Sequence, residues 1–335
     1  MIGGREVGSR LFFPAVLGVV IGWPIAALSQ EQSKAPSAAG PDQRAGASDR
    51  VQADDRPARL SFRKEPDRTR EFLPMVTMDF PNVPGCTCEA WCYESDLEFL
   101  DHRTLESGYM ELRHRVKAQP GVLILTTVVP EPGAVEFVAR AAVDAEGRPG
   151  DALPGNLPFL NICLQVRRAE GFCSKPDPYP EFVRRCFIFT DKGRTFLLDT
   201  HRRKILHRFP ADDPMNNPPW VQMYVGVWQR VPDVQGQGWA EYSTDRYTIP
   251  VIGVASRDAK HLVAMANGSA DTLCNAWHDC LHNNPKWTPA DGPPAGRRWR
   301  VKVYAMANDP AALLARVAKD FPEASGLQQR RVPAK

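Results

Sequence analysis

The sequence lacks the short motifs that mark several enzyme classes. It contains no G-x-S-x-G, no P-loop and no H-E-x-x-H, and its one GQGW stretch is not followed by a helical pattern. The corresponding hydrolase, nucleotide-binding and zinc-peptidase sites are therefore not indicated. Basic residues form no long block and the formal net charge is only +3, which argues against nucleic acid as a partner.

The first thirty residues have the pattern of a secretory signal peptide. Arg5 and Arg10 form a positive n-region, the apolar run LFFPAVLGVVIGWPIAAL follows, and AALSQ supplies small residues for cleavage. The alternative is an uncleaved membrane anchor. An apolar run of 18 residues only just spans a bilayer, and Pro14 and Pro24 interrupt this one. We expect a secreted or periplasmic protein with no stable membrane span after cleavage.

Composition divides the chain into four parts. Residues 1–29 are the predicted signal peptide, and residues 30–59 form a spacer of Ala, Pro, Ser, Gly, Gln and charged residues. The spacer has no hydrophobic period and cannot bury enough surface to become ordered. Residues 60–325 are predicted to form one domain, and residues 326–335 a disordered tail.

All eight cysteines follow the spacer, at Cys86, Cys88, Cys92, Cys163, Cys173, Cys186, Cys274 and Cys280. An even count in an exported chain favours disulfides. Zinc is the competing interpretation, because CTCEAWC and a histidine-bearing segment near the C-terminus are rich in ligands. Zinc cysteines usually occur as C-x2-C pairs, however, and the chain has none. We expect disulfides, expect no cofactor, and assign no metal ligand.

Hydrophobic alternation dominates the middle of the chain. In VEFVARAAV the odd-numbered residues 135–143 share one face, while Glu136 and Arg140 point away. CFIFTDKGRTFLLDT has two apolar runs around a turn and predicts a hairpin. Similar runs with turn residues at short intervals predict an all-β fold, a large two-sheet antiparallel β-sandwich.

Helix is predicted in two places. Asp309 is a good N-cap with proline after it, and apolar residues repeat every four positions up to Phe321, which predicts a short C-terminal helix. Ser95 and Glu98 have capping-box spacing and predict a shorter helix that begins at Ser95.

Three stretches carry a resemblance to a known group of proteins: VEFVARAAVDAEGRP, IPVIGVASRDAKHLVAMA and CLHNNP. In their order the chain resembles uncharacterised secreted bacterial proteins with a galactose-mutarotase-like β-supersandwich, over residues 105–322. That architecture is shared by sugar epimerases, polysaccharide lyases and sandwich domains of several glycosidases. The resemblance implies a carbohydrate ligand, although a fold alone does not assign chemistry.

The segment TLCNAWHDCLHNNPKW admits two structures. A straight helix would separate Cys274 from Cys280 by about 9 Å of rise, too far for a disulfide, which needs Cα atoms within about 7 Å. The helix would instead place His278 and His282 at i and i+4, a spacing typical of zinc ligands. The favoured interpretation is a loop closed by a Cys274–Cys280 disulfide.

Such a loop would suit a sugar. Tryptophan faces fit a pyranose ring, and asparagine and histidine side chains exchange hydrogen bonds with hydroxyl groups. The predicted ligand-binding and catalytic residues here are Trp277, Trp287, Asn283, Asn284, His278 and His282. The alternative is that the tryptophans are core residues and His282 caps a turn.

A second cluster combines His201 and Arg202 with Tyr242. In a lyase a cation or amide neutralises a uronate carboxylate, and a Tyr or His then removes the C5 proton. A solvated basic hairpin is the alternative. A glycosidase would need two converging carboxylates, and the sequence does not show that any two converge.

Together these patterns predict an exported protein that engages a polysaccharide or glycan, with lyase- or hydrolase-type catalysis. The alternative is a non-catalytic carbohydrate-binding or envelope-associated protein.

Overall fold

The computed structural model describes residues 55–66, 72–93, 97–143, 156–166, 169–172, 179–201, 222–232, 241–275, 280–289 and 297–327. The predicted signal peptide, most of the predicted spacer and most of the predicted tail lie outside these residues. Within them, no helix has both the length and the apolar character needed to cross a membrane.

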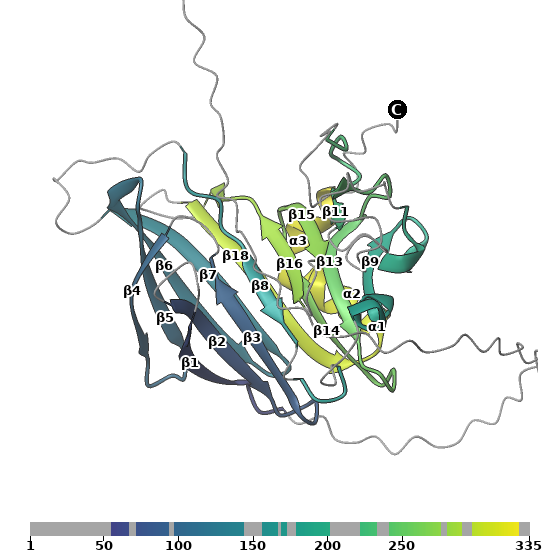
Figure 1. Cartoon of the computed structure of the whole chain (residues 1–335), viewed down its shortest axis with the longest axis horizontal. Helices are drawn as coiled ribbons and strands as arrows, with labels where there is room; N and C mark the ends of the chain where they lie inside the picture. Colours follow the sequence, from purple (N-terminus) through teal and green to yellow (C-terminus); the bar gives the residue numbers. More distant parts are fainter. Residues whose placement is uncertain are drawn as a thin grey trace, which may run out of the picture.

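The fold is a two-sheet β-sandwich, as predicted (Figure 1). The first sheet has eight strands, in the order β1 Arg59–Pro66, β2 Phe72–Phe80, β3 Cys86–Cys92, β8 Ile162–Gln165, β16 Cys280–Pro285, β15 Ala270–Asn275, β11 Gln222–Tyr224 and β12 Glu241–Tyr242. Its pairs are antiparallel except β11 with β12, which is parallel.

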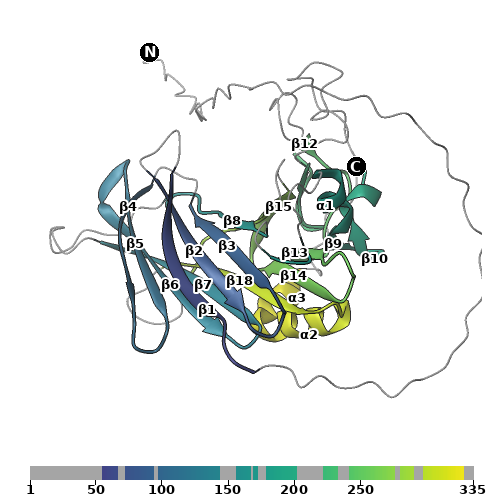
Figure 2. The same cartoon turned by 60° about the horizontal axis from the view of Figure 1, so that its bottom comes forward.

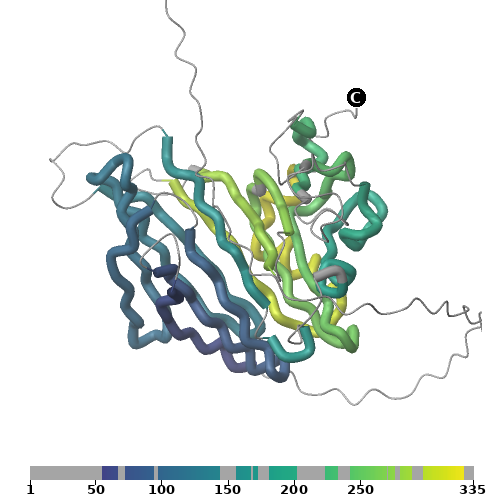
Figure 3. Tube along the Cα trace, viewed as in Figure 1, coloured from purple at the N-terminus to yellow at the C-terminus, as the bar shows by residue number. Residues whose placement is uncertain are grey.

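The second sheet has ten strands and is antiparallel throughout. Its order is β10 Gly193–Phe196, β9 Cys186–Thr190, β13 Ile249–Ala255, β14 His261–Ala266, β18 Arg297–Ala307, β7 Ala134–Val143, β6 Gln119–Glu131, β5 Met110–Val116 and β4 Leu97–Thr104, with β17 Thr288–Pro289 paired to β18. In Figure 3 strands from the two halves of the chain gather at opposite ends of the molecule, with β18 of the C-terminal half lying beside β7 of the N-terminal half.

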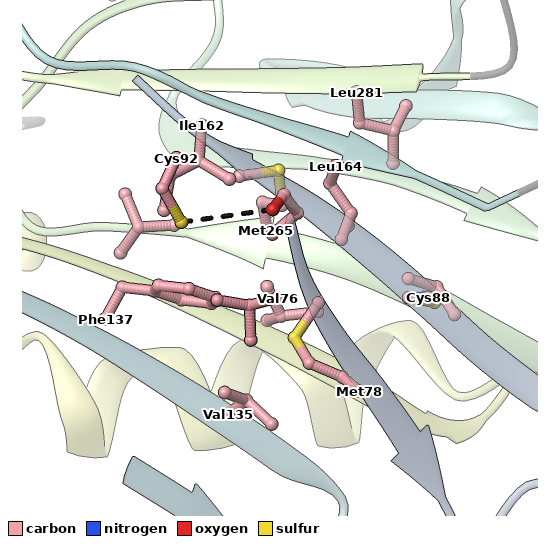
Figure 4. Packing of buried hydrophobic residues seen from close by; sticks show 14 of the residues in the cluster. Val76, Met78, Cys88, Cys92, Val135, Phe137, Ile162, Leu164, Met265 and Leu281 are labelled. Atoms are coloured by element: carbon pink, nitrogen blue, oxygen red, sulfur yellow. Dashed lines mark hydrogen bonds between the residues drawn. The ribbon is translucent and has the colours of Figure 1, made fainter. Parts of the chain in front are cut away.

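The main hydrophobic core lies between the two sheets (Figure 4). Val76 and Leu164 enter it from the eight-stranded sheet, and Val135, Phe137 and Met265 enter it from the ten-stranded sheet. All five side chains are fully buried. The alternation predicted for VEFVARAAV is confirmed in β7, whose inward residues line this core.

A second apolar cluster covers part of the other face of the ten-stranded sheet, over β9, β13, β14 and β18. Helices α2 Pro310–Asp320 and α3 Pro322–Leu327 pack there through Leu313, Val317 and Phe321 (Figure 2). The predicted N-cap is confirmed, because the Asp309 side chain accepts hydrogen bonds from two backbone amides of the first turn. The remaining helical elements are α1 Tyr179–Arg185 and the 3-10 turn Leu197–Asp199.

One of two further predictions from local patterns is confirmed and the other is wrong. The predicted hairpin forms as β9 and β10. The predicted helix from Ser95 is wrong, since the described chain resumes at Leu97 as strand β4. Capping-box spacing is satisfied by many sequences, and pairing of β4 with β5 along its whole length outweighs it here.

The main core contains one histidine, His114 on β5. Its side chain is only 1% exposed, and its ring packs edge-on against Tyr93 and Phe99. Neither ring nitrogen has a hydrogen-bond partner among the described residues. Burial lowers the pKa of His114 from 6.5 to about 3, because the charged imidazolium would lose its hydration.

We expect His114 to make the fold sensitive to acid. Its pKa is depressed in the folded state, so its contribution to stability is present above pH 6.5 and is lost as the pH falls toward 3. The loss amounts to about 1.4 kcal/mol per pH unit, or about 2 kcal/mol between pH 6.5 and 5. His114→Leu should remove this part of the dependence in urea unfolding curves measured across that range.

His261→Leu is the control, because His261 is only partly buried at the start of β14. It should keep the wild-type acid dependence. An H114L protein that loses stability toward pH 5 as steeply as wild type would contradict the assignment.

Candidate functional site

The candidate site lies on the outer face of the eight-stranded sheet, turned away from the main core. Strand register aligns six side chains in one row across six neighbouring strands: Trp91, Cys163, His282, Cys274, Met223 and Tyr242. Residues two apart on a strand share a face, which adds a second row of Glu89, Gln165 and Cys280. The residues between them, such as Leu164 and Leu281, enter the main core.

Two cysteines and one histidine meet at the centre of this face. The Sγ atoms of Cys163 and Cys280 and a ring nitrogen of His282 all lie within 4.8 Å of one another. Cys280 Sγ and His282 Nε2 are 3.2 Å apart, a hydrogen bond. Both cysteines are fully buried and His282 is 5% exposed. Such a group can hold a thiophilic metal ion or maintain a thiolate.

The surroundings of Cys163 favour its thiolate. Burial by itself raises the pKa of this thiol, but hydrogen bonds from Cys280, His282 and Gln165 and the nearby charge of His282 lower it by more. The resulting pKa is about 5, against an ordinary value of 9.0. These contacts favour the deprotonated form of Cys163.

The predicted Cys274–Cys280 disulfide is not formed in this structure, in which no disulfide joins any of the seven described cysteines. The described parts of the segment are antiparallel strands β15 and β16, not a helix, and Cys274 is paired with His282. Cys280 is thus diagonal to Cys274. Diagonal neighbours lie about 7–8 Å apart, beyond the reach of a disulfide.

A buried ion pair lies on the same face. Glu89 is fully buried, and its Oε1 accepts a hydrogen bond of 2.8 Å from Nε of Arg63, which also pairs with Glu65. Next to Glu89 in the row, Gln165 directs Nε2 toward Cys163 Sγ at 4.0 Å. Gln165 Oε1 is buried and has no hydrogen-bond partner in the described part of the chain.

Tyr242 and His201 lie near the other edge of the sheet. Ser243, which follows Tyr242, donates to the His201 carbonyl at 2.7 Å, and the His201 amide donates to Asp245 at 2.5 Å. Burial, and then the charges of Asp271 and Cys274, raise the pKa of Tyr242. Its phenol therefore stays protonated at neutral pH and acts as a donor.

The asparagines of CLHNNP point in opposite directions. Asn283 is on the core side, where its Nδ2 donates to Pro250 O at 3.0 Å and to Met265 O at 3.2 Å. Asn284 is on the outer side, where its Nδ2 donates to Thr272 Oγ1 at 3.0 Å. Asn283 thus uses its amide group to join the two sheets, and its full burial separates it from the outer face.

The indole N–H of Trp287 makes its hydrogen bond within the protein. Its Nε1 donates to Pro158 O at 2.8 Å, and its ring packs against the main core. Three other predicted site residues, Trp277, His278 and Arg202, lie outside the described residues.

Sequence reasoning missed four residues of this face: Trp91, Glu89, Cys163 and Gln165. A signal for them was present. CTCEAWC and NICLQ alternate apolar residues with residues that bind ligands or donate hydrogen bonds, so each strand has one chemical face. Neither stretch indicates which strands pair, so the sequence does not show that these strands lie beside the strand that carries His282.

Comparisons with known proteins show little. No family model and no curated protein matches the chain. Among solved structures, the chain is similar to the GH36 alpha-galactosidase AgaA from Geobacillus stearothermophilus, with 10% identity and a TM-score of 0.31. That alignment covers 79% of this chain and 37% of the other, so the chain spans little more than a third of that enzyme.

We expect Arg63 to be required for stability. Arg63→Met would leave the fully buried carboxylate of Glu89 without the guanidinium that now pairs with it. The free energy of unfolding should fall by about 2 kcal/mol or more. Adding Glu89→Gln should recover part of this loss, since it removes the buried charge. Urea unfolding at pH 7 measures both variants.

Arg113→Met is the matched control. Arg113 pairs with Asp101 at 3.1 Å, but both side chains are about half exposed, so its loss should cost less than about 1 kcal/mol. Equal losses in the free energy of unfolding at Arg63 and Arg113 would show that the buried pair with Glu89 contributes no more to stability than an exposed pair.

Proposed function

We propose that the protein binds a polysaccharide or other glycan on the outer face of the eight-stranded sheet and acts on it by a lyase- or hydrolase-type reaction. The observation that supports this is the row from Trp91 to Tyr242. It crosses five strand spacings, about 24 Å. Its two ends are partly buried aromatic residues, and Cys163, His282 and Cys274 between them are buried. The distance between the ends suits contacts with different sugar rings of one chain.

The chemistry at the two ends suits sugar rings and their hydroxyl groups. Trp91 supplies a flat apolar face for stacking, and Tyr242 supplies a ring together with a phenol. Because its pKa is raised, Tyr242 donates its proton in a hydrogen bond. Asn284 Oδ1, on the same face as His282, is buried and has no partner among the described residues, so it would accept a hydrogen bond from a hydroxyl group that reaches it.

The spacing of these groups limits the mechanism. Tyr242 and His282 are three strand spacings apart, about 14 Å, so they would contact different sugar units. His282 would therefore transfer the proton at one glycosidic bond, with Cys163 and Cys274 beside it on the neighbouring strands. The same separation favours the second candidate function, glycan binding without catalysis.

Export is part of the proposal and rests on the N-terminal residues. Arg5, Arg10 and the apolar run after them direct the chain to the secretory route, as argued above. We propose a secreted or periplasmic location, where polysaccharides are accessible.

We expect Trp91→Ala to weaken polysaccharide binding by about 1 kcal/mol, or about fivefold, because it removes a stacking surface. Tyr242→Phe should weaken binding through loss of the phenol alone. Affinity electrophoresis against a panel of neutral and uronate-containing polysaccharides measures binding. Absorbance of unsaturated ends and reducing-sugar release, read in parallel, separate lyase, hydrolase and non-catalytic binder.

Trp287→Phe is the control, since the indole of Trp287 is engaged with Pro158 and the core. It should change stability and leave binding unaltered. The proposal is rejected when no polysaccharide in the panel is retained, or when Trp91→Ala and Tyr242→Phe bind as well as wild type.

A further inference from the structure

The cluster of Cys163, Cys280 and His282 has the donor set and spacing of a transition-metal site. Zinc bonds to cysteine sulfur at about 2.3 Å and to histidine nitrogen at about 2.0–2.1 Å. In a tetrahedron these lengths place two sulfurs about 3.8 Å apart and a sulfur and a nitrogen about 3.5 Å apart. The three atoms here lie within 4.8 Å of one another, with one sulfur–nitrogen distance of 3.2 Å. Shifts of about one ångström would close the tetrahedron around an ion.

We propose that Cys163, Cys280 and His282 bind one thiophilic divalent ion of the zinc type, with three protein ligands and a fourth position open. Thiolate and imidazole are the ligands such ions prefer. Two thiolates, a neutral imidazole and a dication together carry no net charge. A neutral complex avoids most of the cost of burying separate charges, which suits a site whose sulfurs are fully buried.

Strand geometry favours a metal over a disulfide at this place. Cys280 is paired with Gln165 and His282 with Cys163, so Cys163 and Cys280 are diagonal neighbours on β8 and β16. A disulfide needs Cβ atoms about 3.5–4.5 Å apart, closer than diagonal positions allow. A metal ion bridges the longer gap because each sulfur keeps its own bond to it.

A neighbouring side chain marks the open position. Gln165 is 2% exposed, and its Nε2 is directed at Cys163 Sγ. Its Oε1 is buried and has no partner among the described residues. A water molecule in the fourth position would donate a hydrogen bond to such an acceptor. Ordered water commonly satisfies buried polar atoms in this way.

The backbone of one ligand is also held in place. Asn275 Nδ2 donates to the Cys280 carbonyl at 2.7 Å across the hairpin. This contact fixes the start of β16, from which Cys280 and His282 both project. Outer contacts of this kind orient metal ligands before the ion arrives.

The metal proposal uses neither Trp91 nor Tyr242, so a loss of glycan binding would leave it standing. It does share His282 with the catalytic step proposed above, and a metal-bound His282 fits glycan binding without that step. Its test begins with purified protein, reduced and freed of metal, and titrated with Zn²⁺ and with Co²⁺. We expect one equivalent per chain. The cobalt form should show thiolate-to-metal charge-transfer bands in the near ultraviolet and intense visible bands from a tetrahedral ion.

Single substitutions then identify the ligands. Cys163→Ala, Cys280→Ala and His282→Ala should each weaken zinc binding by more than the about 10–100-fold typical of losing an outer-shell partner. Gln165→Ala should weaken it within that smaller range. Competition with a chromophoric chelator measures the affinities, and circular dichroism confirms that each variant is folded.

Two cysteine variants serve as matched controls. Cys274→Ala lies on the same face, opposite His282, and Cys88→Ala lies on the core side of the same sheet. Both should bind zinc as wild type does. Where a ligand variant fails to fold, X-ray absorption of the wild-type zinc form decides, with two sulfur ligands expected.

The proposal is overturned if no metal is retained after dialysis, if the cobalt spectrum lacks thiolate bands, or if the ligand variants bind zinc as tightly as the two controls. Formation of a Cys163–Cys280 disulfide in the presence of saturating zinc would also overturn it.

Discussion

The buried amide of Asn283 fixes the side of the sheet on which the site lies. Its Nδ2 donates to two carbonyls of the opposite sheet, Pro250 O and Met265 O, and its Oδ1 accepts from Asn267. All of its donors and its acceptor oxygen are thereby used. In a strand, a slip of one residue moves every side chain to the other face. Locking Asn283 inward therefore holds its neighbour His282 outward, in line with Cys163.

The two sheets differ in the residues on their outer faces. The ten-stranded sheet is apolar against the main core and beneath α2 and α3, while the outer face of β4 and β5 carries exposed ion pairs. The eight-stranded sheet shares that core, but its outer face carries thiols, an imidazole, a carboxylate and a carboxamide. Groups of this kind are costly to bury unless they are paired or bound. Their collection on one face, with Glu89 paired to Arg63, is the strongest mark of function in the molecule.

Features set by residues close together in the sequence could be predicted, while features set by the order of distant strands could not. The hairpin of β9 and β10, the inward face of β7 and the N-cap at Asp309 depend on neighbouring residues, and all three agree with prediction. The site depends on β3, β8 and β16, which lie far apart in the chain and become neighbours only through sheet order. The sequence therefore marks His282 as unusual but does not indicate Cys163, which lies beside it only through strand pairing. The helix predicted from Ser95 failed for the same reason, because pairing with β5 overrides a local capping signal.

Cysteine placement follows from the same geometry. An even number of cysteines behind a predicted signal peptide predicts disulfides, yet no disulfide joins the described cysteines. Cys86 and Cys88 are two residues apart on one strand, with parallel side chains and sulfurs 3.9 Å apart. Cys280 is diagonal to both Cys163 and Cys274. Neither arrangement brings Cβ atoms to disulfide distance. Strand register therefore holds these pairs of cysteines apart, and Cys163 and Cys280 are both fully buried beside His282, a placement that suits ligands to one ion better than a disulfide.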